Sequence, residues 1–287
     1  MKALNKRLAE LAFYCLVLVI AVYLLFPIYW AVSLSLQSHS DTVRIPISFY
    51  PKHLTFENYR AVLADEALLD SLGSSFLIAS TTTILSLLLG TLAAFALARF
   101  RFRFRKGFLM LMLAMTTFPT ISFLTGLFSI YRFVKWLNET VFWFYLPVTG
   151  LLVVMYMIFT LPLAVWLLTY FIQGLPSELF EAARIDGASV MQTFRLIVLP
   201  LTVPALVSAG LLTFIASWNE FLFALTFTLL EPDLSTVPVA MSSYERVGMP
   251  VGQVMAAALI VTLPIILVTI IFQNRILAGL TAGAVKQ

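Results

Sequence analysis

Long apolar runs constrain the fold of this chain more than any other feature. Five of them contain no acidic or basic residue: Leu11–Ser35, Leu72–Ala98, Phe108–Ile130, Leu146–Ile172 and Val247–Asn274. A sixth run, Leu201–Leu230, contains one charged residue, Glu220. A helix needs about 20 predominantly apolar residues to cross a bilayer. The sequence therefore predicts an all-α integral membrane protein with six transmembrane helices.

The composition supports this prediction and excludes several kinds of site. Hydrophobic residues make up 61% of the chain and charged residues only 11%, whereas a soluble domain is about half apolar and about a quarter charged. The single cysteine, Cys15, cannot form an internal disulfide. His39 and His53 are too few for a metal site. We therefore expect no metal, no cofactor and no catalytic residue on this chain.

Prolines interrupt several of the apolar runs. They are Pro27, Pro119, Pro162, Pro204 and Pro264. Each removes one helical hydrogen bond and can kink its helix, which membrane helices tolerate when neighbours satisfy the freed carbonyl. Two interpretations stay open: ordinary kinks, or a bundle that rocks between two states.

The basic residues predict the orientation of the chain. Twelve of the 18 lysines and arginines fall in the connections on the side of the two termini, and six fall in the others. Because cytoplasmic connections carry the excess of positive charge, we expect a multi-pass inner-membrane protein with both termini cytoplasmic. The expected parts are a cytoplasmic N-terminus at 1–10, a first helix at 11–35, an extracytoplasmic loop at 36–71, a five-helix core at 72–274 and a cytoplasmic tail at 275–287.

Arginine and phenylalanine alternate between the second and third runs, in Arg99-Phe-Arg-Phe-Arg-Phe-Arg-Lys106. Such a stripe can contact nucleic acid, but between two membrane helices it favours anchoring of a tight turn at the lipid headgroups. We therefore expect membrane lipid, and no nucleic acid, as a partner of this segment.

A polar segment, residues 173–200, separates the fourth run from the fifth. Pro176 suits the first position of a helix, and Glu178 would then lie in the first turn, where the helix dipole favours a carboxylate. Gly187 can end that helix in the left-handed conformation, and a second short helical pattern runs on to Pro200. The segment therefore predicts a helix–turn–helix elbow outside the membrane.

Charge distinguishes two roles for this elbow. Its three acids and two bases give a net charge of −1, whereas an element resting on anionic lipid should be basic. The small alanines permit close approach of a partner and contribute little to membrane insertion. The pattern favours a docking site for a protein over an amphipathic elbow on the lipid surface.

The elbow also resembles the "EAA" loop of binding-protein-dependent ABC importers, by which a membrane subunit grips its ATPase. The matching positions are Glu181, Ala182, Ala183, Asp186, Gly187, Ala188, Phe194, Ile197, Leu199 and Pro200. The resemblance implies the type I ABC importer permease fold with a cytoplasmic coupling loop. It also implies that Glu181 pairs with a basic residue of the ATPase, that Ala182, Ala183 and Ala188 line the contact, and that Gly187 sets the angle between the helices.

Two further segments are similar to those of carbohydrate-uptake permeases of the maltose type. They are Trp218-Asn-Glu-Phe221 and the terminal Gly279-Leu-Thr-Ala-Gly-Ala-Val-Lys286, which resembles the tail of the second permease subunit. The family implies import of a sugar or sugar-like solute by alternating access. The implied partners are a homologous permease, two ABC ATPases and an extracytoplasmic solute-binding protein. No phosphate-loop motif occurs in the chain, so ATP and Mg would bind to the separate ATPase.

Glu220 is the one carboxylate inside an apolar run, and with Trp218 and Asn219 it is a candidate for the translocation path or a gate. It lies 16 residues after Pro204, ~24 Å along a helix and so in the outer part of a hydrocarbon core about 30 Å thick. An interhelical hydrogen bond with Asn219 or with Ser80, Thr81, Thr82 or Thr83 is the structural alternative. A different class of function also remains open, an ion-coupled secondary transporter or channel that uses Glu220.

Overall fold

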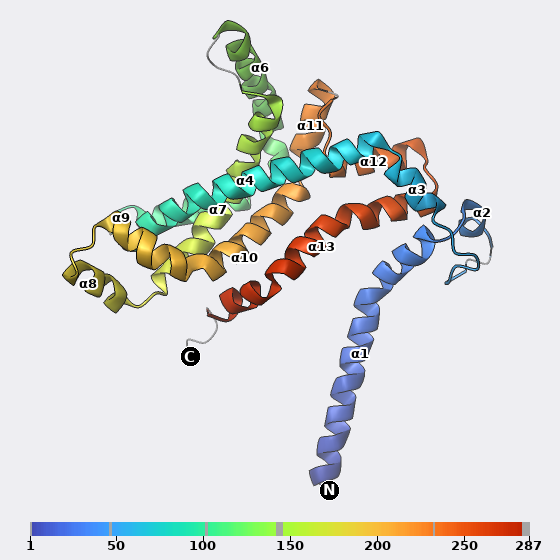
Figure 1. The fold of residues 1–287 in the computed structure, drawn as a ribbon, viewed down its shortest axis with the longest axis horizontal. Coiled ribbons are helices and arrows are strands. Elements are labelled where there is room, and N and C mark those ends of the chain that lie inside the picture. Colours follow the sequence, from blue (N-terminus) through green and yellow to red (C-terminus); the bar gives the residue numbers. More distant parts are fainter. Residues whose placement is uncertain (1, 46–47, 101–102, 142–145, 232, 283–287) are drawn as a thin grey trace. The chain divides into compact units, whose positions relative to one another are not determined.

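The computed structural model describes residues 2–45, 48–100, 103–141, 146–231 and 233–282, and every regular element in these ranges is helical (Figure 1). In chain order the elements are α1 (Lys2–Ser35), α2 (His39–Thr42), α3 (Glu57–Leu63), α4 (Glu66–Arg99), α5 (Arg105–Thr116), η1 (Thr120–Phe123), α6 (Leu124–Thr140), α7 (Val148–Gln173), α8 (Ser177–Ile185), α9 (Val190–Thr193), the π-helical turn η2 (Phe194–Val198), α10 (Leu199–Trp218), α11 (Leu222–Leu230), α12 (Val237–Val247) and α13 (Val251–Ala282).

Five helical segments in the described part of the chain are long and apolar enough to cross a membrane. They are Lys6–Ser35, Glu66–Arg99, Val148–Gln173, Val190–Trp218 and Val251–Gln273. A sixth crossing requires a bent pair, Arg105–Thr116 with Thr120–Thr140. The all-α membrane fold predicted from the sequence is confirmed, with five to six apolar helices.

The third apolar run, 108–130, is not the single helix that we expected. Its two halves, in α5 and α6, meet at an angle of 96°. The bend falls at Pro119, which is extended (φ −62°, ψ 120°) and caps η1. Proline lacks an N–H and disfavours helical geometry in the residue before it, so the helix ends just upstream.

The run 201–230 is also broken, because α10 ends at Trp218 and α11 begins at Leu222.

The last helix, α13, continues past the expected boundary at residue 274 as far as Ala282. The rest of the expected tail, residues 283–287, lies outside the described residues.

The contacts divide the chain into two units, residues 1–69 with 241–263, and residues 70–240 with 264–287. In the first unit, Asn58 joins α3 to the end of α1. Its side-chain amide donates to the carbonyl oxygens of Ser35 at 2.9 Å and Gln37 at 2.8 Å. An added Cβ on Gly252 would lie 2.5 Å from the same amide nitrogen. A methyl group at this position of α13 would therefore force the Asn58 amide to shift.

In the second unit, small and polar residues bring α4 and α7 close together. An added Cβ on Gly90 would lie 3.2 Å from Cβ of Ala164, and one turn away the Ser86 and Thr160 hydroxyls lie 2.9 Å apart. Small side chains at membrane helix contacts allow such an approach, and hydroxyl pairs add hydrogen bonds across the contact.

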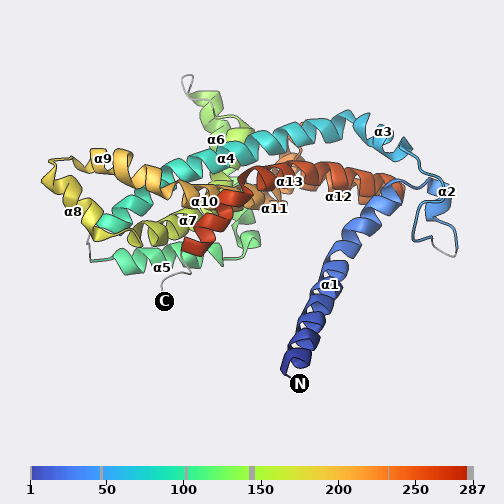
Figure 2. The same ribbon diagram turned by 60° about the horizontal axis from the view of Figure 1, so that its bottom comes forward.

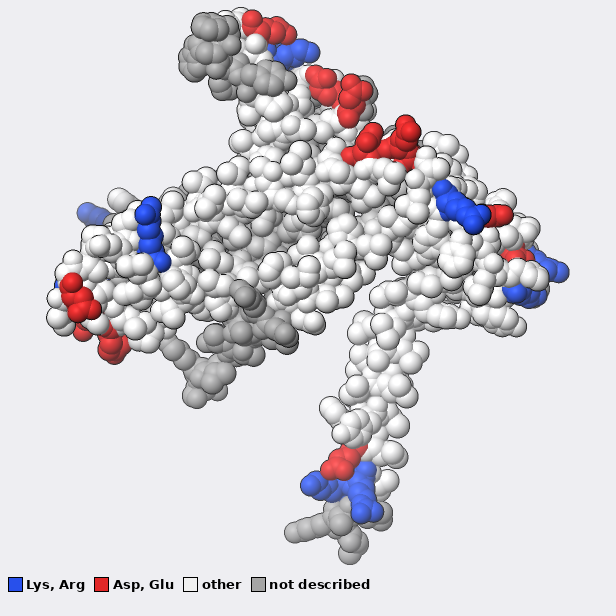
Figure 3. All heavy atoms as spheres, viewed as in Figure 1, with Lys and Arg blue, Asp and Glu red and all other residues white. Residues whose placement is uncertain are grey.

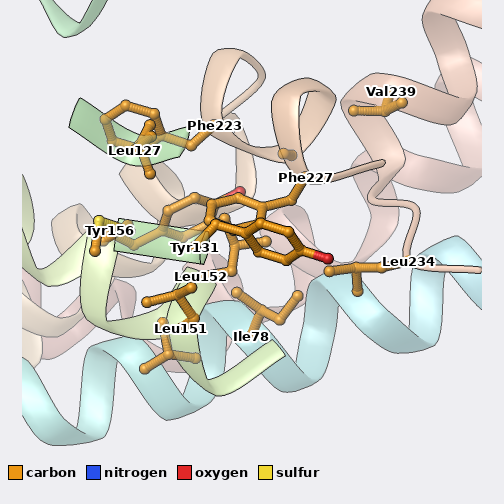
Figure 4. Packing of buried hydrophobic residues seen from close by; sticks show 13 residues of the cluster. Ile78, Leu127, Tyr131, Leu151, Leu152, Tyr156, Phe223, Phe227, Leu234 and Val239 are labelled. Carbon is orange, nitrogen blue, oxygen red and sulfur yellow. The ribbon is translucent and has the colours of Figure 1, made fainter. Parts of the chain in front are cut away.

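An aromatic and aliphatic core lies beyond this contact, where α11, α6 and α7 meet α4 (Figure 4). Phe223 and Phe227 of α11 are fully buried there. Tyr131 of α6 packs edge-on against Phe227 at 6.0 Å, and Ile78 and Leu152 fill the space below. The short helix α11 is therefore part of the protein core.

Helices α7 and α10 run side by side, and the chain leaves them at one end to form α8 and α9 (Figures 1 and 2). The middle of the surface over α4 and α10 carries almost no charged side chain, and charges appear at its margins, including the end that holds α8 and α9 (Figure 3). An uncharged flank of this kind suits a helix bundle surrounded by lipid.

Candidate functional site

The first arm of the elbow, α8, ends in a glycine-based cap. Gly187 has a φ of +75°. Its N–H donates to the Arg184 carbonyl at 3.1 Å, and the N–H of Ala188 donates to the Ala183 carbonyl at 2.9 Å. These two bonds form the Schellman motif, which satisfies the last carbonyls of a helix and requires a left-handed residue. Gly187 thus ends α8 and starts the turn.

The second arm, α9, begins with a capping box. The Ser189 N–H donates to Oε1 of Gln192 at 2.8 Å, and the Gln192 N–H donates to Oγ of Ser189 at 3.3 Å. Such a reciprocal pair satisfies two otherwise unpaired N–H groups at a helix start. The helix–turn–helix elbow predicted from the sequence is therefore confirmed.

The elbow has two distinct faces. Glu181, Ala182, Asp186 and Gly187 are exposed, as is Pro200, whereas Ala188, Ile197 and Leu199 are half-buried. Ala183 is only 3% exposed and Phe194 only 7%. These two side chains pack against the subunit's own helices, on the side away from the face that carries Glu181.

Aromatic contacts hold the buried face in place. Phe180 of α8 is 6% exposed, and the Arg99 guanidinium at the end of α4 lies 4.5 Å from its ring centre. Phe194, which continues the second arm at the start of η2, lies 5.1 Å from Phe95, one turn before Arg99 on α4. Both arms therefore rest on the same end of α4. Phe95, Arg99 and Phe180 were not predicted from the sequence as site residues, although Phe180 and Ala183 stand three residues apart and so share one helix face.

Glu220 has a local role that the sequence did not reveal. Its Oε1 accepts the N–H of Phe223 at 3.0 Å and its Oε2 accepts the N–H of Ala224 at 3.2 Å, so the carboxylate caps the start of α11. A carboxylate is favoured at a helix N-terminus because it pairs the free N–H groups and complements the dipole. The buried Tyr156 hydroxyl on α7 lies beside it without a hydrogen bond of normal geometry.

The neighbours of Glu220 point in different directions. Trp218 is 3% exposed and stacks on Phe214 at 5.6 Å. Asn219 is exposed and donates to the Ile215 carbonyl at 3.0 Å. The structural alternative, a hydrogen bond from Glu220 to Asn219 or to Ser80–Thr83, is not present among the described residues, where the carboxylate caps α11.

Among the described residues, no three His, Cys, Asp or Glu side chains gather as a metal site would require. Cys15 is exposed on α1.

Comparison with known proteins identifies the family. The sequence matches the family described as binding-protein-dependent transport system inner membrane component over residues 86–281. The chain belongs to this family. The match covers the elbow, α10 and the end of α4 against which the elbow packs.

Relatives of this inner membrane component are permease proteins. The chain is 38% identical over 267 residues to the trehalose transport system permease protein SugB of Mycobacterium tuberculosis, covering 92% of this chain and 93% of the relative. It is 38% identical over 273 residues to the trehalose/maltose transport system permease protein MalG of Thermococcus litoralis, covering 94% of each. It is 35% identical over 263 residues to the sulfoquinovosyl glycerol transport system permease protein SmoH of Agrobacterium fabrum, covering 91% of this chain and 89% of the relative.

A solved structure shares the fold of this family member. It is a chain of a bacterial ABC transporter involved in the import of the acidic polysaccharide alginate, with a TM-score of 0.73 and 22% identity, covering 94% of this chain and 97% of that chain. The type I importer permease fold predicted from the sequence is confirmed. The chain is a transport subunit and not an enzyme, and its family does not favour the ion-coupled alternative.

Proposed function

We propose that this permease carries a sugar or sugar-like solute across the inner membrane, driven by ATP hydrolysis on separate subunits. The main support for this proposal is that the elbow has one buried face and one exposed face. One face is fixed to α4 through Phe180 and Phe194, while the opposite face presents Glu181 and Ala182 to a partner. The names of the relatives, which refer to trehalose, maltose and sulfoquinovosyl glycerol, support the solute class.

The proposed complex contains this chain, a homologous permease, two ABC ATPases that bind ATP and Mg, and an extracytoplasmic solute-binding protein. The family description supports the last of these, because it names a binding-protein-dependent system. The exposed acids of the elbow suit a basic partner surface, with Glu181 paired to a basic residue of the ATPase.

The excess of basic residues supports an orientation in which the elbow and both termini are cytoplasmic. Cysteine replacements can test it by labelling from outside intact cells. A cysteine at Ser48 or Ser235 should react, and one at Arg103 or Ser189 should not. Labelling at Arg103 from outside would contradict the orientation.

Alternating access follows from the connections of the elbow. Closure of the ATPases would displace α8, which follows α7 after residues 174–176, and α9, which leads through η2 into α10. The far end of α10 stops at the break capped by Glu220, so a tilt of α10 would reach the α10–α11 junction. This chain's contribution to transport is therefore to convert movement at the elbow into movement at that break.

Reconstituted vesicles test the proposed function. The complete complex, with its binding protein outside and ATP inside, should accumulate labelled trehalose or maltose without any ion gradient. Uptake that persists without ATP and follows a proton or sodium gradient would contradict the proposal. Uptake of another solute class under ATP would keep the importer and refute the sugar assignment.

A further inference from the structure

Two adjoining cavities lie beneath the elbow at the end of α4. One, of about 400 Å³, is lined by Ala98, Arg99, Arg105, Ile172, Gln173, Leu175, Ser177 and Phe180. The other, of about 370 Å³, is lined by Phe95, Arg99, Phe100, Phe180, Arg184, Ala188, Val190 and Thr193. Arg99 and Phe180 line both. We refer to the pair as the basic cavities.

Positive charge dominates these cavities. Arg99, Arg105 and Arg184 line them, and no acidic residue is among their described lining residues. Arg99 and Arg105 are half-buried. The Arg99 guanidinium covers the Phe180 ring, a contact that leaves its N–H groups free for an anion. The acids Glu178 and Glu181 of the same elbow are exposed and line neither cavity.

The walls combine this charge with apolar surface. Ile172, Leu175 and Phe180 line the first cavity, which lies where α4 and α7 end and α5 begins. In the proposed orientation these helix ends stand at the cytoplasmic headgroup layer. Basic pockets between membrane helices on this side suit anionic lipid headgroups. The apolar part of the wall favours a lipid, which carries apolar chains beside its phosphate, over a soluble anion.

We propose that the basic cavities bind the phosphate of an anionic phospholipid, with Arg99 and Arg105 as its main contacts. The proposal rests on the proposed function for the orientation of the elbow. A headgroup in this place touches Phe180 and the start of α8, so it would fix the elbow against α4. The anionic lipid content of the membrane would then regulate coupling between the elbow and the ATPase.

The test uses the complete transporter, purified in mild detergent without solute or ATP. Native mass spectrometry measures the anionic phospholipid that stays bound. We expect wild type to retain it. Arg99→Gln and Arg105→Gln should each lower its apparent affinity about fivefold, which corresponds to the loss of about 1 kcal/mol of electrostatic attraction per basic residue. Arg103→Gln is the matched control, because Arg103 belongs to the same basic segment but is exposed and lines neither cavity. A loss in this variant as large as that in Arg99→Gln would indicate general attraction of lipid to the segment and would overturn the proposal.

A second arm measures solute-stimulated ATP hydrolysis in nanodiscs of zwitterionic lipid with and without anionic phospholipid. Wild type and Arg103→Gln should be stimulated by the anionic lipid, and Arg105→Gln should not. If Arg99→Gln fails to assemble, Arg105→Gln together with the charge-preserving Arg99→Lys decides the question. Lipid retention is measured without any transport assay. An absence of import activity would therefore refute the proposed function without affecting the lipid measurement.

Two further outcomes would overturn the proposal. Equal lipid retention by wild type, Arg99→Gln and Arg105→Gln would place the lipid elsewhere. Displacement of the bound lipid by inorganic phosphate, with the same dependence on Arg99 and Arg105 and no stimulation by anionic nanodiscs, would assign the cavities to a soluble anion.

Discussion

The rings of Phe95 on α4 and Phe194 in the second arm of the elbow lie 5.1 Å apart, and both side chains are buried. This contact ties the elbow to a membrane helix that is far away in the sequence. Since Phe180 of the first arm rests on Arg99 of the same helix, both parts of the elbow are in contact with α4.

Removal of the Phe194 ring should loosen the elbow. Truncation of a buried phenylalanine to alanine costs about 3–5 kcal/mol in soluble cores, and here the loss falls on one contact at the edge of the bundle. We expect Phe194→Ala to remain inserted but to lose most of its bound ATPase on purification. Phe194→Leu keeps much of the volume and serves as the control. Equal ATPase retention by wild type and Phe194→Ala would show that the contact does not support docking.

A side chain at Gly187 should misdirect the second arm. The left-handed backbone at this residue costs a non-glycine residue about 1–2 kcal/mol, and a β-branched residue more. Gly187→Val should insert normally but lose solute-stimulated ATP hydrolysis or the ATPase itself. The same change at Gly107 is a control, since a Cβ there meets nothing within 4 Å and its φ is not positive. Wild-type coupling in Gly187→Val would refute this role of the turn.

Glu220 should act through the break between α10 and α11. Glutamine keeps one side-chain oxygen as an acceptor for an N–H of α11, whereas leucine keeps none, and loss of a helix cap costs about 0.5–2 kcal/mol. We expect Glu220→Gln to assemble with altered transport and Glu220→Leu to be impaired in both stability and transport. Thermal unfolding and ATP-driven uptake measure the two effects. If Glu220→Leu transports normally, the residue is neither a gate nor a ligand.

Gly252 should be intolerant of a methyl group. A Cβ at this position would lie 2.5 Å from the side-chain nitrogen of Asn58, which is already held by two carbonyl oxygens. Overpacking of this kind costs about 1–3 kcal/mol. Gly252→Ala should lower the melting temperature, whereas Gly126→Ala, where nothing lies within 4 Å, should not. Equal melting temperatures would mean that Asn58 moves aside without cost.

The sequence predicted the class of fold and the elbow because both depend on local patterns. A charge-free run of more than 20 residues, or a glycine between two short helical patterns, can be interpreted without knowledge of the tertiary contacts. The breaks were harder to predict. Pro27, Pro162, Pro204 and Pro264 all lie inside continuous helices, whereas the chain bends at Pro119. Whether neighbours satisfy the carbonyl that a proline frees decides between the two outcomes, and one-dimensional patterns do not contain that information.

The candidate site shows the same division. The positions of Glu181 and Gly187 could be read from the motif, but its two faces could not. Ala182 and Ala183 are identical in type and adjacent in sequence, and only packing against the rest of the subunit separates the exposed one from the buried one. The capping role of Glu220 likewise depends on a turn of the chain at Asn219, and the hydrophobic pattern of the sequence did not predict that turn.

Cross-linking from these two alanines tests the central claim, that the exposed face of the elbow docks on the ATPase. With Cys15 replaced by serine, a cysteine is placed at Ala182 in one variant and at Ala183 in another, and a short thiol cross-linker is added to the assembled complex. The structure predicts a cross-link to the ATPase subunit from position 182 and little or none from position 183. Cross-linking of neither variant, or equal cross-linking of both, would contradict the docking of this face.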